Sequence, residues 1–289
     1  MKIQTLKNNF KNTLLGLYPL EEIESFFNIL SEKYLKLSRI KIALNPNREI
    51  SEEEEAEFQA ALIRLKKNEP LQYIIGETEF NGLPFKVNEH TLIPRPETEE
   101  LVEWILADLS EIKPRNDFSI TELKVLDIGT GSGCIAISLS KNLPEAKVSA
   151  IDISEEALKL ASLNAEMNEV AVNFIQKDVL SEKTLPDKYS IIVSNPPYVR
   201  ELEKDQMMPN VLNYEPEIAL FVKDDDALLF YRTIAQLAKF HLKPSGKLYF
   251  EINEFLGEEL SVFLTDEGFK NIQLKRDIYG KNRMLKCEF

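Results

Sequence analysis

The residues best suited to chemistry in this sequence are Ser194-Asn195-Pro196-Pro197-Tyr198, which follow an apolar run typical of a buried strand. Two consecutive prolines fix two φ angles and remove two backbone donors, so the chain leaves the strand in a stiff, extended conformation. This stiffness holds the Pro196 carbonyl beside the Asn195 side chain, whose amide both accepts and donates hydrogen bonds. Tyr198 adds an aromatic face with a polar tip. We predict that Asn195, Pro196, Pro197 and Tyr198 form a clamp for a planar NH2 group, with two acceptors for its two hydrogens.

A clamp of this kind suits an NH2 group that is a poor nucleophile. The lone pair of a nitrogen attached to a carbonyl or to a heteroaromatic ring is delocalised, as it is in the peptide bond. Acceptors that hold both hydrogens can favour the pyramidal nitrogen that forms during attack, which assists the transition state more than the ground state. The alternative interpretation is a proline-rich turn without a chemical role.

A second motif, Asp127-Ile128-Gly129-Thr130-Gly131-Ser132-Gly133, lies between a predicted strand and a predicted helix. Glycines let the backbone approach a ligand closely and present N–H groups to it. A Walker A loop would end in Gly-Lys-Ser or Gly-Lys-Thr, whereas this loop ends in Gly-Cys. The dinucleotide fingerprint G-x-G-x-x-G would need glycine or alanine where Cys134 stands. The loop therefore predicts a nucleoside site that has no pyrophosphate to cradle.

Two aspartates follow the next two predicted strands. Asp152 ends the second strand, where its carboxylate is placed to accept from both hydroxyls of a ribose. Asp178, or the backbone beside it, follows the third strand and is placed for an adenine amino group. Both positions agree with a nucleoside site.

Strand and helix patterns alternate through the C-terminal two thirds of the chain, after a polar connection at 110–121. We expect strands at 124–128, 148–152, 173–176, 190–194, 247–252, 271–275 and 284–288, with helices at 134–140, 155–168 (capped by Ser154), 226–241 and 254–266. Such alternation predicts an α/β fold with a mostly parallel sheet, whose ligands lie beyond the carboxyl ends of the strands. Asp127, Asp152, Asp178 and Asn195 all fall at or just past those ends.

The N-terminal part of the chain is predicted to be a small helical bundle over residues 1–70. Apolar residues recur at helical spacing from Leu6 to Leu17, from Ile23 to Leu37 and in a third helix at 51–67, which Ser51 caps. The bundle serves either packing or the recognition of a partner. Residues from Gln72 to Val87 are β-prone and surround Asn81-Gly82, a strong hairpin signal.

Two further segments accompany the main motifs. In the stretch from Leu92 to Glu99, two prolines stiffen an extended segment around Arg95, and a helix is expected from Glu97 to Leu109. A rigid arginine can fix a carboxylate or a backbone carbonyl, and the alternative is a linker with a surface salt bridge. The stretch 199–222 exceeds usual loop lengths, which predicts a lid or a wall of the substrate site.

Composition limits the possible partners. The net charge of −13 and a pI near 4.9 leave little basic surface for duplex DNA or long RNA, so no direct nucleic-acid binding is expected. Lysines interrupt the apolar residues near the N-terminus and no apolar run has the length of a spanning helix, so we expect a cytoplasmic protein without membrane association. His90 and His241 have no partner at ligand spacing and the two cysteines lie far apart, so no metal site is expected.

Taken together, these motifs resemble a class I S-adenosylmethionine-dependent methyltransferase that acts on an amide or an exocyclic amine. Further segments are similar to the peptide chain release factor glutamine methyltransferase family: Gln72-Tyr73-Ile74-Ile75-Gly76, Glu79-Phe80-Asn81-Gly82-Leu83, Leu92-Ile93-Pro94-Arg95-Pro96-Glu97-Thr98-Glu99, Glu215-Pro216-Glu217 with Ala219-Leu220, and Tyr231-Arg232. The resemblance covers nearly the whole chain. It implies a Rossmann-like catalytic domain and, as substrate, the glutamine of the Gly-Gly-Gln loop of release factors, methylated on its side-chain amide nitrogen.

The resemblance also implies roles for individual residues. Asn195 and the Pro196 carbonyl would accept from the substrate amide, Tyr198 would pack against it, and Pro197 and Arg95 would belong to the substrate site. S-adenosylmethionine would be surrounded by Asp127, Gly129, Thr130, Gly131, Ser132, Gly133, Asp152, Asp178, Val179 and Asn195. Asp127 and Tyr198 are candidates to stabilise the positive charge of its sulfonium.

This chain departs from the family at two positions. The family usually has glycine where Asn253 follows Glu251-Ile252, and usually has Asp-Gly near Asp226-Ala227. We expect these departures to affect loop conformation near the cofactor and not the reaction. The domain organisation expected is a bundle at 1–70, a hairpin and linker at 71–95, and a methyltransferase domain at 96–289. Two alternatives stay open: an adenine-amino methyltransferase of DNA or RNA, and a catalytically silent binding protein.

Overall fold

The computed structural model describes residues 1–112 and 123–289, and the chain forms two compact units. Unit 1 comprises Met1–Gly76 together with Met208–Tyr214, and unit 2 comprises Glu77–Met207 and Glu215–Phe289. Across the described ranges, none of the helices combines the length and the apolar character that a membrane span requires.

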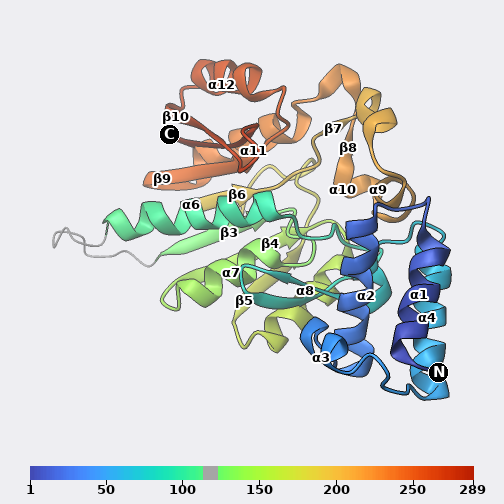
Figure 1. The fold of residues 1–289 in the computed structure, drawn as a ribbon. Coiled ribbons are helices and arrows are strands. Elements are labelled where there is room, and N and C mark those ends of the chain that lie inside the picture. The colour runs from blue at the N-terminus through green and yellow to red at the C-terminus, as the bar shows by residue number, and fades with distance from the viewer. Residues whose placement is uncertain (113–122) are drawn as a thin grey trace. The chain divides into compact units, whose positions relative to one another are not determined.

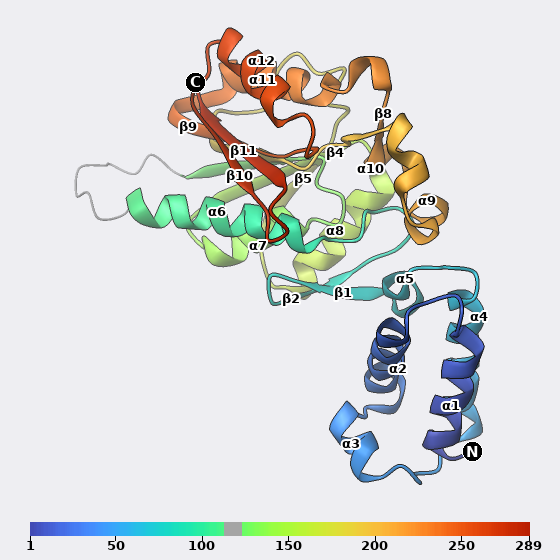
Figure 2. The same ribbon diagram turned by 45° about the horizontal axis from the view of Figure 1, so that its top comes forward.

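Unit 1 is a bundle of helices (Figure 2), and aromatic side chains form part of its core. Its helices are α1 (Ile3–Leu14), α2 (Leu20–Leu35), α3 (Arg39–Leu44), α4 (Glu52–Leu65), α5 (Leu71–Ile75) and α9 (Pro209–Tyr214). Phe10, Phe27 and Phe58 are buried, with ring centroids 5.5 to 6.3 Å apart. Ser51 begins α4 as predicted, because its hydroxyl accepts from the Glu54 N–H while the Glu54 carboxylate accepts from the Ser51 N–H.

The prediction of three helices was incomplete, and the β-prone interpretation of the residues before Gly76 was wrong. Leu71–Ile75 forms α5, which follows Pro70 and ends at Gly76 with a φ of +71°. A short apolar run does not by itself distinguish a strand from a buried helix. Leu71 and Ile74 lie one helical turn apart and both pack into the core of unit 1, which favours the helix.

The hairpin that Asn81-Gly82 predicts is confirmed, and its strands are shorter than the predicted β-prone stretch from Gln72 to Val87. β1 (Glu77–Phe80) pairs antiparallel with β2 (Leu83–Lys86), and Phe80 lies opposite Leu83. Asn81 and Gly82 have φ angles of +52° and +71°, as a two-residue hairpin turn requires. The hairpin contributes the buried rings of Phe80 and Phe85 to unit 2.

Unit 2 is built on a seven-stranded sheet in the order β10-β11-β9-β6-β3-β4-β5 (Figure 1). The strands are β3 (Lys124–Ile128), β4 (Lys147–Asp152), β5 (Val172–Gln176), β6 (Tyr189–Ser194), β9 (Leu242–Glu251), β10 (Lys270–Arg276) and β11 (Asn282–Glu288). The strands β9, β6, β3, β4 and β5 are parallel neighbours, which confirms the mostly parallel sheet. The short turn at 277–281 leaves no room for a crossover between β10 and β11, so these two strands are antiparallel. β11 also runs antiparallel to its other neighbour, β9.

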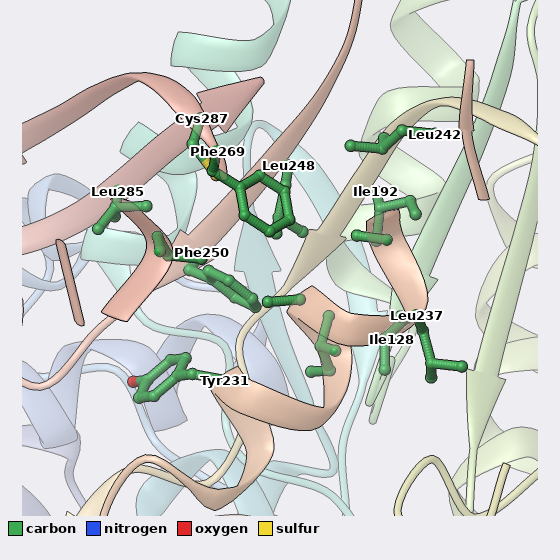
Figure 3. Packing of buried hydrophobic residues seen from close by; sticks show 14 of the residues in the cluster. Ile128, Ile192, Tyr231, Leu237, Leu242, Leu248, Phe250, Phe269, Leu285 and Cys287 are labelled. Carbon is green, nitrogen blue, oxygen red and sulfur yellow. The ribbon is translucent and has the colours of Figure 1, made fainter. Parts of the chain in front are cut away.

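Helices cover both faces of this sheet (Figure 1). One face carries the hairpin, α6 (Pro96–Ile112), α7 (Cys134–Asn142) and α8 (Glu155–Met167), and the other carries α11 (Leu229–His241) and α12 (Gly257–Asp266). Along β6, Ile191 packs on the first face and Ile192 on the second. Figure 3 shows the second core, where Tyr231 of α11 meets Phe250 of β9 edge to face at 5.2 Å between centroids. Burial of both faces explains why the strands are continuous apolar runs in the sequence.

The stretch 199–222 has secondary structure of its own. It contains β7 (Val199–Arg200), the 3-10 helix η1 (Glu201–Gln206), α9, α10 (Glu217–Leu220) and β8 (Phe221–Val222), and the 3-10 helix η2 (Asp224–Asp226) follows. β7 and β8 pair in parallel. Of the polar connection expected at 110–121, the first residues belong to α6, and residues 113–122 lie outside the described part of the chain.

Candidate active site

A cavity of about 260 Å³ lies at the carboxyl ends of the parallel strands of unit 2. The sheet order places β4 and β6 on opposite sides of β3, so the chain reverses its direction of winding there, which is where open α/β sheets bind ligands. The cavity walls come from the segments after β3, β4, β5 and β6, from 90–98, and from α10 and α11. The predicted site residues in its lining are Arg95, Gly129, Thr130, Gly131, Ser132, Asp152, Asp178, Val179, Asn195, Pro196 and Pro197.

The glycine loop after β3 is held in shape by backbone bonds. The Gly129 and Thr130 N–H groups donate to the Ile151 carbonyl at the end of β4, at 2.9 and 3.1 Å. Gly129 and Gly131 have φ angles of +74° and +55°, and a methyl group added to either would meet no atom within 4 Å. The loop therefore leaves an open cradle beside its backbone, which a side chain at either glycine would fill.

Asp152 fixes both the glycine loop and the start of α8. Its Oδ2 accepts from the Gly131 N–H at 2.8 Å, and its Oδ1 accepts from the Ser154 N–H at 2.9 Å. Burial raises the pKa of the Asp152 carboxyl, and the backbone N–H groups partly oppose this. The Ser154 hydroxyl in turn accepts from the Ala157 N–H, which confirms it as the cap of α8. Asp178 lies in the same wall and its Oδ1 accepts from the Leu180 N–H.

The Asn195 segment forms the opposite wall. The Ser194 hydroxyl donates to the Ile128 carbonyl at 2.6 Å, which joins the end of β6 to the end of β3. Pro196 is buried and Asn195 is half-buried. The Asn195 Nδ2 lies 3.3 Å from the Thr98 Oγ1 in the first turn of α6. The structure thus brings Asn195, Pro196 and Pro197 of the predicted clamp into the same cavity as the glycine loop.

Three predicted site residues lie behind the cavity instead of lining it. Asp127 is fully buried and its Oδ2 accepts from the Thr130 hydroxyl at 2.6 Å. Gly133 starts α7 with a φ of +83°, and a methyl group there would come within 2.9 Å of Ile137 and 3.1 Å of Ala161. The Tyr198 hydroxyl donates to the Glu251 carboxylate at 3.0 Å. Each of these residues supports a segment that does line the cavity.

Arg95 lines the cavity and also forms an ion pair. Its guanidinium donates to Oε1 of Glu215 at 2.5 Å, and Oε2 of the same carboxylate accepts from the Ile93 N–H at 3.1 Å. The Glu215 side chain is 1% exposed and the Arg95 side chain 31%, so the pair is partly buried and is not the surface salt bridge that the sequence left open. It fixes the stiff segment 92–96 to the segment that precedes α10.

Several residues of the site were not predicted. Thr98 and Glu251 form a hydrogen bond behind Asn195, and Asn164 of α8 donates to the Ser132 carbonyl and exchanges two bonds with Lys86. Apolar lining comes from Ile218, Phe230 and Ile234. The only available signals were the positions of Thr98 and Glu251 within the segments that carry the family resemblance. In the described ranges, no group of three or more His, Cys, Asp or Glu side chains is arranged to hold a metal ion.

Comparisons with known proteins identify the family. Residues 18–76 match the family model for the PrmC N-terminal domain, and residues 109–215 match the methyltransferase small domain. The chain is 51% identical to the release factor glutamine methyltransferase of Flavobacterium psychrophilum over the full length of both. It is 44% identical to that of Bacteroides thetaiotaomicron, over 95% of this chain and 96% of the relative.

The chain belongs to the release factor glutamine methyltransferase family. It is therefore an S-adenosylmethionine-dependent methyltransferase, as the motifs predicted. Among solved structures, the human methyltransferase 10 domain containing protein is similar in fold, with a TM-score of 0.51 and 17% identity over 81% of this chain and 97% of that one.

The cavity fits the cofactor of this family. Gly129 and Gly131 leave an open cradle for the ligand, and Asp152 and Asp178 supply carboxylates at the ends of β4 and β5. Asp127 Oδ1 is a buried oxygen without a hydrogen-bond partner in the described structure, which suits a site for a positively charged ligand. These groups are suited to bind a nucleoside that carries a positive charge.

The burial of Asp127 leads to a prediction about stability. Burial raises the pKa of the Asp127 carboxyl to about 7, whereas the unfolded chain has a value near 3.8. The folded state disfavours the charged form of this carboxyl. The carboxyl therefore does not lower the free energy of unfolding below pH 4, lowers it increasingly from pH 4 to pH 7, and lowers it by a constant amount above pH 7. The Asp127→Asn variant stays neutral throughout. We therefore compare the melting temperatures of the variant and the wild type without cofactor. The difference, variant minus wild type, should increase by several degrees from pH 5 to pH 8. Parallel pH profiles for the two proteins would contradict this.

The two departures from the family have local explanations. Ala227 has a φ of −62° and therefore does not need glycine. The Asn253 side chain is buried, and its Nδ2 donates to the Tyr198 carbonyl at 3.0 Å and to the Glu203 carboxylate at 2.9 Å. Asn253 thus joins the end of the clamp segment to η1, a tie that glycine could not make.

We expect Asn253→Ala to loosen η1. The substitution leaves the Glu203 carboxylate and the Tyr198 carbonyl each without one buried donor, at a cost of about 1 to 3 kcal/mol. Amide hydrogen exchange in residues 199–206 should become at least several-fold faster, while exchange in β3 and β4 should stay unchanged. Equal exchange in the variant and the wild type would show that the tie has no such effect.

Proposed function

We propose that this protein transfers a methyl group from S-adenosylmethionine to the side-chain amide nitrogen of the glutamine in the Gly-Gly-Gln motif of peptide chain release factors. The observation that carries the proposal is that Asn195 and Pro196 lie in the wall of the same cavity as the glycine loop and Asp152. An acceptor pair for an NH2 group therefore faces a nucleoside site. The names of relatives that align over the whole chain support the same substrate.

The protein's part in the reaction is alignment of the amide. Asn195 Oδ1 and the Pro196 carbonyl accept from the two hydrogens of the substrate NH2, which orients its lone pair and favours a pyramidal nitrogen. The two prolines keep these acceptors in place during the reaction. Transfer would form the new N–C bond and break the bond between the methyl carbon and the sulfonium sulfur, which would leave as a neutral thioether, and the amide nitrogen would release one of its two protons to water. No strong base is needed beforehand, because the nitrogen becomes acidic only as the bond forms.

The remaining cavity residues hold the methyl donor. The glycine loop and Asp152 would bind the nucleoside through its ribose, and Asp178 with Val179 would border the adenine. When bound, S-adenosylmethionine supplies an activated methyl group on a positively charged sulfur. The buried carboxylate of Asp127 and the ring of Tyr198, which lie behind the lining, would favour that charge.

The wider setting of the enzyme is proposed on the same basis. Release factors act in translation, so we propose that the protein works in the cytoplasm. We also propose three functional parts: a bundle that extends beyond residue 70 through α5 to Gly76, a hairpin and linker up to residue 95, and a methyltransferase domain at 96–289. In this scheme the bundle either supports the catalytic domain or contacts the release factor.

The test is transfer of labelled methyl from S-adenosylmethionine to a purified bacterial release factor. Parallel reactions contain the same factor with its loop glutamine replaced by alanine, and duplex DNA. Label on the intact factor alone supports the proposal. Label on both factors equally would point to another protein site, and label on DNA would point to an adenine amine.

A further inference from the structure

Four side chains form a chain of hydrogen bonds that begins in the cavity wall, which Asn195 and Thr98 line, and continues behind it. Asn195 Nδ2 lies 3.3 Å from Thr98 Oγ1, and Thr98 Oγ1 lies 2.6 Å from Glu251 Oε2. The other oxygen of Glu251 accepts from the Tyr198 hydroxyl at 3.0 Å. Thr98 and Glu251 are 2% and 1% exposed, so water does not compete for these bonds.

The parallel pairing of the strands brings these groups together. Ser194 at the end of β6 lies opposite Phe250 near the end of β9, which places Asn195 beside Glu251. Thr98 comes from the first turn of α6, where its N–H donates to the Arg95 carbonyl. Backbone hydrogen bonds thus fix the positions of Asn195, Glu251 and Thr98 independently of the bonds between their side chains.

The direction of each hydrogen bond follows from the carboxylate. Two hydroxyl donors converge on Glu251, and the 2.6 Å distance is typical of an O–H donating to a charged oxygen. An ionised carboxylate only accepts, so the single proton of the Thr98 hydroxyl is committed to Glu251. The Thr98 oxygen can then only accept from Asn195. This requires the NH2 of Asn195 to face Thr98, which leaves its Oδ1 for the cavity.

Burial raises the pKa of the Glu251 carboxyl, and the hydroxyls of Thr98 and Tyr198 oppose that rise by donating to its charged form. The Arg283 guanidinium lies 5.9 Å from the centre of the Tyr198 ring, donates to the Ile252 carbonyl at 3.2 Å, and opposes the rise that burial causes in the Glu251 pKa. Its Nε also donates to Asp277 at 3.3 Å. Removal of Thr98 or Glu251 would let the Asn195 amide rotate and present either of its ends.

We propose that Thr98 and Glu251 are positioning residues, which set the orientation of the Asn195 amide so that its oxygen accepts from the NH2 group of the substrate. The catalytic consequence rests on the proposed function, whereas the orientation of the amide does not. An NH2 group facing the substrate amine would repel it, and the alignment of the nucleophile would be lost. Thr98 borders the cavity, but in this scheme its hydroxyl is held by Glu251 and makes no hydrogen bond to the substrate.

The experiment compares Thr98→Val, which removes the hydroxyl at nearly constant volume, with Thr98→Ser, which keeps it. The matched control is Thr233→Val in α11, where the hydroxyl donates to the Leu229 carbonyl away from the cavity lining. We expect Thr98→Val to lower kcat by about 10- to 100-fold. Thr98→Ser and Thr233→Val should stay within about threefold of wild type, and the Kd for S-adenosylmethionine should change less than about threefold in all three variants.

A second measurement reads the orientation without any substrate. In protein labelled with 15N-asparagine, the side-chain NH2 signal of Asn195, assigned with Asn195→Asp, should exchange slowly with water in wild type and Thr98→Ser. It should exchange at least tenfold faster in Thr98→Val. If wild type fails to methylate a release factor but shows this pattern, the positioning role stands and only the proposed substrate fails. Unchanged exchange and kcat in Thr98→Val, or equal losses in Thr98→Ser, would overturn the positioning role.

Discussion

Asn195→Ala is expected to lower kcat for methyl transfer by about 100- to 1000-fold, the loss usual for removal of one preorganised polar group at a reacting centre. The substitution removes the only side-chain acceptor of the proposed clamp and leaves the Pro196 carbonyl to hold one hydrogen of the substrate amine. The amine could then rotate, and its lone pair would no longer be aligned. Single-turnover transfer of labelled methyl to the release factor measures this loss.

Two controls separate chemistry from folding in that experiment. Asn173→Ala removes the same amide from the exposed side of β5 and should leave kcat unchanged. The Kd of the Asn195 variant for S-adenosylmethionine should increase by no more than severalfold, because the glycine loop and Asp152 remain. A variant that keeps more than about a tenth of wild-type kcat would contradict the assignment of Asn195 as the amine acceptor.

The second large effect is expected at Asp152. Asp152→Ala removes the proposed acceptor for the ribose hydroxyls together with the bonds to the Gly131 and Ser154 N–H groups. Hydrogen bonds to a charged group contribute about 1.5 to 3 kcal/mol each, so we expect the Kd for S-adenosylmethionine to increase by about 10- to 100-fold or more. Isothermal titration with S-adenosylmethionine measures it directly.

Thermal unfolding supplies the control for this variant. A ligand that binds only the folded state raises the melting temperature, so wild type and the exposed-site variant Asp266→Ala should both gain stability from saturating cofactor. The melting temperature of Asp152→Ala should rise little at the same cofactor concentration. Its melting temperature without cofactor measures the stability lost with the contacts to Gly131 and Ser154. An unchanged Kd in a folded Asp152→Ala protein would remove Asp152 from the cofactor site.

Local sequence patterns predicted the alternating architecture of unit 2 and the two motifs that line the cavity. Strands buried on both faces appear as short apolar runs, and the polar residues that end them must meet at one edge of a parallel sheet. The capping serines Ser51 and Ser154 and the turn at Asn81-Gly82 are local signals, since their hydrogen bonds and φ angles involve only neighbouring residues. For these features, local sequence and tertiary structure agree.

Other features depend on contacts between residues far apart in the chain, which local patterns do not encode. The partner of Arg95 is Glu215, 120 positions away, and the partner of Thr98 is Glu251, 153 positions away. No periodicity encodes such pairs, because they arise from strand order and from the packing of α6. The same holds for Leu71–Ile75, whose β-branched residues suggested a strand until contacts with the bundle core made a helix. Local patterns thus predicted the glycine loop and the Asn195 segment, and long-range packing brought Thr98 and Glu251 beside Asn195.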